Sequence, residues 1–148
     1  MKAATGGHRN IVELLLDKGA DIESMDYLFT GVGSTTLFEA VRMGHKDVVE
    51  LLLQRGAKIT RRDISFLHEE SSALWLAINS GNRLMVRLLL ANGADIEWRD
   101  RSLGTPLSFA VRSLDAGMAQ ILLENGASTE SLKWAEEEWL QEYVLRFR

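Results

Sequence analysis

The stretch Gly44–Ala57, which reads GHKDVVELLLQRGA, decides the fold because the chain contains four versions of it. The other three are GHRNIVELLLDKGA from Gly7, GNRLMVRLLLANGA from Gly81 and LDAGMAQILLENGA from Leu114. The glycines before their final alanines are Gly19, Gly56, Gly93 and Gly126, so the copies follow at intervals of 37, 37 and 33 residues. A regular interval of this length is typical of proteins built by stacking small structural units.

Each copy has the pattern of an amphipathic helix that ends at a glycine. In the second copy Val48, Val49, Leu52 and Leu53 are spaced i, i+1, i+4 and i+5, which places one broad apolar stripe on a helix. The glycine suits the left-handed residue just past a helix end, where a Cβ would be strained. Each copy therefore predicts one helix with a buried side.

A shorter pattern precedes the last three copies and predicts a second helix. It reads TTLFEAVRM from Thr35, SALWLAINS from Ser72 and TPLSFAVRS from Thr105. The first hydroxyl of each can cap a helix start, and Pro106 falls at the first helical position, where its missing N–H costs nothing. Small residues recur where the two helices of a pair approach, namely Ala40, Ala77 and Ala110.

The order Thr-Pro-Leu, Ala, Gly-His, Val-Val, Leu-Leu and Gly-Ala strongly resembles the ankyrin repeat, over residues 2 to 131. The resemblance implies stacked antiparallel helix pairs, each with a projecting β-turn finger. We therefore predict an all-α ankyrin-repeat solenoid over residues 1–131. Its expected divisions are a truncated first repeat (1–26) and three complete repeats (27–63, 64–100 and 101–131).

The two ends of the chain depart from this pattern. The first repeat lacks its Thr-Pro-Leu part, so the chain is expected to be a piece of a longer array or to have a minimal N-terminal cap. Residues 132–148 have an amphipathic pattern and are expected to form a helix that caps the stack, with docking into a partner as the alternative. In the fourth copy Leu114 and Asp115 replace Gly-His and Gly117 lies inside the helix, so that repeat is expected to be the softest.

Composition narrows the classes of function. The net charge of -4 and the lack of basic clusters make nucleic acid a poor partner. Neither a membrane-spanning run nor a signal peptide is evident, and there is no cysteine, so we expect an intracellular protein, cytoplasmic or nuclear, with no membrane partner.

The sequence offers no group of residues that suggests catalysis. His8 and His45 occupy the same repeat position, which indicates a structural role, and His68 beside two glutamates is more typical of a solvated loop than of a metal ligand. Motifs for zinc hydrolysis, phosphate binding and serine nucleophiles are missing. We therefore expect no enzyme, no cofactor, no metal and no catalytic residue.

Candidate partner-binding residues fall into two groups. Aromatic and basic residues of the fingers could anchor a partner: Phe29, Phe66, Trp98, Arg99 and Arg101. Alternatively, the first two complete fingers, each four residues longer than the third, pack on one another. The resemblance adds positions at the ends of the first helices, on the concave face: Arg42, Met43, Asn79, Ser80, Arg112 and Ser113. In contrast, Phe38 and Trp75 are expected in the core.

The expected function is that of a non-catalytic scaffold that binds another protein through its fingers and concave face. One alternative is a regulatory part of a larger enzyme or receptor. Another is self-association through the truncated first repeat, which would make the chain a structural oligomer. The partner's identity does not follow from the sequence.

Overall fold

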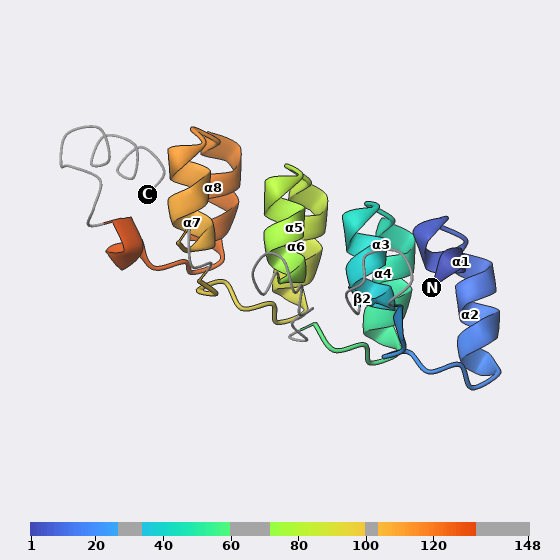
Figure 1. Ribbon diagram of the computed structural model, residues 1–148. Coiled ribbons are helices and arrows are strands. Elements are labelled where there is room, and N and C mark those ends of the chain that lie inside the picture. Colours follow the sequence, from blue (N-terminus) through green and yellow to red (C-terminus); the bar gives the residue numbers. More distant parts are fainter. Residues whose placement is uncertain (27–33, 60–71, 100–103, 133–148) are drawn as a thin grey trace. The chain divides into compact units, whose positions relative to one another are not determined.

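The computed structural model describes residues 1–26, 34–59, 72–99 and 104–132 (Figure 1). Eight α helices form four successive pairs in these ranges. They are α1 (Lys2–Thr5), α2 (Arg9–Asp17), α3 (Thr36–Arg42), α4 (Lys46–Gln54), α5 (Ala73–Asn79), α6 (Arg83–Ala91), α7 (Pro106–Arg112) and α8 (Ala116–Glu124), followed by the 3-10 helix η1 (Thr129–Leu132). The predicted all-α fold of helix pairs is confirmed. The capping helix expected over 132–148 lies outside the described residues, except for Leu132.

The three complete first helices begin at the residues that the sequence indicated. Thr35, Ser72 and Thr105 precede α3, α5 and α7. The hydroxyl oxygen of each accepts the backbone N–H three residues later, at 3.2, 3.1 and 3.2 Å. Each cap satisfies one of the N–H groups that a helix leaves unpaired at its start.

The chain divides into two compact units, residues 1–95 and 96–148. In the first unit α3 packs on α4 and α5 packs on α6, and each pair also contacts the next, through α1 with α3, α3 with α5 and α2 with α4. Ala40 and Ala77 are fully buried, which allows this close approach of helices. In the second unit α7 packs on α8 and η1 packs on α7.

A short hairpin forms the base of one finger in the first unit. Its strands are β1 (Met25–Asp26) and β2 (Ser34–Thr35), which pair antiparallel with Met25 opposite Thr35 and Asp26 opposite Ser34. Strand β2 leads directly into α3. The hairpin therefore ties the base of this finger to the start of a first helix.

Candidate functional site

The first helices of the first unit present exposed residues at their C-terminal ends. Val41 and Ile78 are buried, whereas the two residues after each of them are exposed. These four exposed residues occupy equivalent positions at the ends of α3 and α5, two helices that contact each other. We call them the first-helix surface: Arg42, Met43, Asn79 and Ser80. The side chain of Met43 is 47% exposed, although it is apolar.

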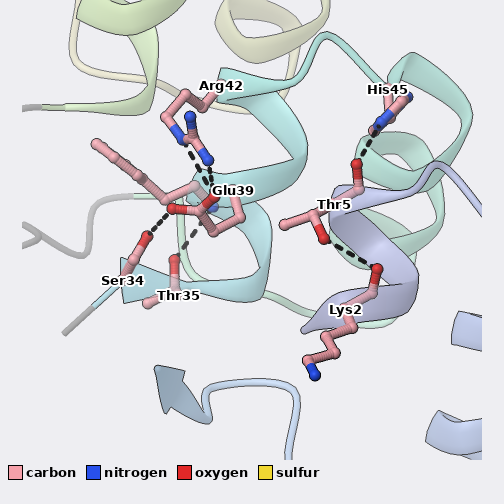
Figure 2. Close-up of polar contacts among 8 residues, drawn as sticks. Lys2, Thr5, Ser34, Thr35, Glu39, Arg42 and His45 are labelled. Atoms are coloured by element: carbon pink, nitrogen blue, oxygen red, sulfur yellow. Dashed lines mark hydrogen bonds and ion pairs between the residues drawn. The ribbon is translucent and has the colours of Figure 1, made fainter. Parts of the chain in front are cut away.

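A buried carboxylate holds Arg42 in place on this surface (Figure 2). Arg42 donates from Nε and Nη2 to Glu39 Oε2, at 3.1 and 2.6 Å. The second carboxylate oxygen, Glu39 Oε1, accepts the hydroxyl of Ser34 at the finger base, at 2.9 Å. Glu39 is only 8% exposed, so these partners satisfy a group that would be costly to bury alone. The two bonds to Glu39 fix the direction of the guanidinium on this exposed surface.

Sequence reasoning did not identify Glu39 as part of the site. The signal was present, because Leu76 and Phe109 occupy the same position in the next two first helices. A charged residue at a position that is otherwise apolar indicates a specific polar partner. Recognising Ser34 as that partner needed the geometry of the hairpin.

In the second unit the corresponding residues Arg112 and Ser113 are also exposed. Leu114, which follows them, is 76% exposed and has φ of 56°. At the same position Gly7, Gly44 and Gly81 have φ of 71°, 76° and 67°. A left-handed leucine is strained, and such strain is often stored at functional positions. Leu114 therefore joins Arg112 and Ser113 as a candidate contact residue.

Leu114→Gly should increase stability. Relief of the left-handed strain is worth about 1–2 kcal/mol, and the extra freedom of glycine in the unfolded chain offsets about 0.5–1 kcal/mol of it. We expect a net gain of about 0.5–1 kcal/mol in the free energy of unfolding, measured by urea denaturation. In Leu84→Gly, which changes another exposed leucine inside α6, a loss of about 1 kcal/mol is expected instead. Equal losses in both variants would contradict the strain at Leu114.

The finger residues are only partly described. Trp98 is half-buried and Arg99 is exposed, while Phe29, Phe66 and Arg101 lie outside the described residues. Whether the fingers contact a partner or one another therefore stays a prediction. Of the two aromatic residues expected in the core, Trp75 is 7% exposed, as predicted, and Phe38 is half-buried.

Among the described residues, no three histidine or acidic side chains are grouped so that they could hold a metal ion. None of the described helices is long and apolar enough to cross a membrane. His8 and His45 are the two histidines in the described part of the chain. The ring nitrogen Nε2 of His45 is hydrogen-bonded to the backbone carbonyl oxygen of Thr5 in the preceding repeat, at 2.8 Å, which agrees with a structural role (Figure 2).

The family model for ankyrin repeats (3 copies) matches residues 1–63 and 64–132. The chain therefore belongs to the ankyrin repeat family, as the sequence motifs indicated. Repeats of this family are generally protein–protein interaction modules and are typically non-catalytic. A search of curated proteins found no match to the chain.

Proposed function

We propose that this chain is a non-catalytic scaffold that binds an intracellular protein through the first-helix surface and the fingers. The observation that carries the proposal is the switch from buried to exposed residues at the ends of α3 and α5. Val41 and Ile78 are 3% and 4% exposed, yet the residues that follow them are open to solvent. Residues that the core does not need are free to contact a partner.

The chemistry of the first-helix surface supports a protein partner. It combines one hydrogen-bonded guanidinium, one exposed methionine and two small polar residues. Arginine and methionine are enriched at protein interfaces, and a side chain whose direction is already fixed loses less entropy on binding. The net charge of -4 disfavours nucleic acid as the partner.

The test compares capture of partners by four proteins. They are the unchanged chain, a first-helix variant (Arg42→Ala, Met43→Ala, Asn79→Ala), a finger variant (Phe29→Ala, Phe66→Ala, Trp98→Ala) and the control Gln54→Ala on the exposed side of α4. Captured proteins are identified by mass spectrometry, and their affinities are then measured by calorimetry.

We expect the first-helix variant to bind the captured partner at least about tenfold more weakly, which corresponds to about 1.4 kcal/mol. The control should bind as the unchanged chain does, and circular dichroism should show that all four are folded. If the first-helix and finger variants both bind the same partner with unchanged affinity, the proposed surface is wrong.

A further inference from the structure

Arg42 keeps hydrogen-bond donors that the contact with Glu39 does not use. A guanidinium carries N–H donors along more than one edge. The edge with Nε and Nη2 faces Glu39, because both atoms donate to Oε2, at 3.1 and 2.6 Å (Figure 2). The edge with Nη1 and the second N–H of Nη2 has no hydrogen bond or ion pair to any other described residue. A pair of parallel donors is therefore available on Arg42.

The contact with Glu39 also sets where this second edge lies. Glu39 is buried and bonded to Ser34, whereas the side chain of Arg42 is 51% exposed. The inner edge of the guanidinium is thus held by a buried carboxylate, and the second edge belongs to the exposed part of the side chain. Because Arg42 has already lost rotamer freedom in the fold, a ligand on this edge binds at a lower entropic cost.

The arrangement is specific to the second repeat. Arg112 occupies the equivalent position at the end of α7, but Phe109 stands there in the place of Glu39. In α5 the two positions are taken by Leu76 and Asn79. Of the three complete first helices, only α3 places a glutamate one turn before an exposed arginine.

An exposed apolar side chain follows Arg42 directly. Met43 is the C-cap residue of α3 and is 47% exposed. Its flexible thioether side chain can adapt to apolar groups of different shapes. The first-helix surface therefore offers an apolar contact next to the pair of donors on Arg42.

The charge of this surface favours a carboxylate over a phosphate group as the ligand. Arg42 is the one cation among the four residues of the first-helix surface, and Glu39 beside it already offsets its charge. A phosphate group carries a charge of about −1.5 to −2 at pH 7, so it would meet Glu39 without a second cation to balance it. A carboxylate carries a single charge, and its two oxygens match two parallel N–H donors of a guanidinium.

We propose that the first-helix surface recognises an aspartate or glutamate of the partner that stands next to a large apolar residue. The carboxylate oxygens accept hydrogen bonds from Nη1 and Nη2 of Arg42, and the apolar side chain packs on Met43. This inference rests on the proposed function, because it names the chemistry of the partner at the same surface. The occupant is a short acidic and apolar segment of another protein.

The probe is a displayed library of short random peptides. The library is depleted on the first-helix variant and then selected on the unchanged chain, so that the retained peptides need the first-helix surface. In a retained peptide the acidic residue is changed to the matching amide. The affinities of both peptides are measured by fluorescence anisotropy for the unchanged chain, for Arg42→Gln and for the control Lys18→Gln. The control removes one positive charge from an exposed residue at the end of α2.

We expect the retained peptides to share an acidic residue next to a large apolar one. The change from acid to amide should weaken binding about tenfold in the unchanged chain and in Lys18→Gln, because a charge-assisted contact is lost. In Arg42→Gln the acidic peptide and its amide should bind equally, because the partner of the acid is gone. This comparison within each protein isolates the contact even if Arg42→Gln changes the surface in other ways.

Retained peptides without an acidic residue would overturn the inference, and so would an equal loss of affinity from acid to amide in all three proteins. Tighter binding of a peptide with phosphoserine in place of the acid would overturn it in favour of a phosphate ligand. If no peptide is retained while the first-helix variant loses the captured protein, this inference is wrong and the proposed function stands. If capture is unchanged as well, both are wrong.

Discussion

Leu51→Ala is expected to lower the free energy of unfolding by about 2–5 kcal/mol, the usual loss when a buried leucine is truncated. Leu51 is 1% exposed on α4, and α4 contacts α2 of the preceding repeat. Removal of its side chain loses apolar burial and leaves a space that neighbouring helices fill only in part. The measurement is urea denaturation followed by circular dichroism.

Leu14→Ala is the matched control because Leu14 occupies the same place in the first repeat. Its side chain is 57% exposed, and alanine and leucine are both good helix formers. We expect a change within about 0.5 kcal/mol. Similar losses for both variants would mean that the two positions have the same surroundings, which would contradict the difference in burial.

Leu14 and Leu51 show which features of the fold can be predicted from the sequence and which cannot. Repetition located both helices, because the spacing of apolar residues and the glycine landmarks are local properties of the chain. Leu14 and Leu51 occupy the same place in their repeats, yet Leu51 is 1% exposed and Leu14 is 57% exposed. The burial of a helix residue depends on whether another repeat packs on that helix, and the sequence of the helix itself does not show this.

The candidate site was less predictable than the fold for a related reason. The exposure of Arg42 and Asn79 could be predicted from the sequence, because each follows the last apolar residue of its first helix. The bond from Ser34 to Glu39 joins a hairpin to a helix, and the left-handed conformation of Leu114 departs from the glycine of the other copies. Contacts between distant elements and local backbone strain are seen only in the structure, whereas periodic patterns are visible in the sequence.

Gly7→Ala is expected to destabilise the protein more than the equivalent change Gly44→Ala. Both glycines have left-handed backbones, with φ of 71° and 76°, so each alanine costs about 1–2 kcal/mol. A Cβ on Gly7 would also lie 2.7 Å from Nδ1 of His45, whereas a Cβ on Gly44 would meet only Asn82 Nδ2, at 3.7 Å. The clash with the ring should add about 1–3 kcal/mol, in the range of other overpacked sites.

The ring of His45 cannot move away without loss, because its Nε2 is bonded to the Thr5 carbonyl oxygen. A double-mutant cycle with His45→Ala therefore isolates the clash. In the His45→Ala background Gly7→Ala should cost no more than Gly44→Ala does, a coupling of about 1–3 kcal/mol within the range seen for contacting residues. Equal costs of Gly7→Ala in both backgrounds would mean that the ring does not lie over Gly7. Gly7 would then be needed only for its left-handed turn. The two repeats would be held together by the hydrogen bond from His45 to Thr5 and by the packing of their helices.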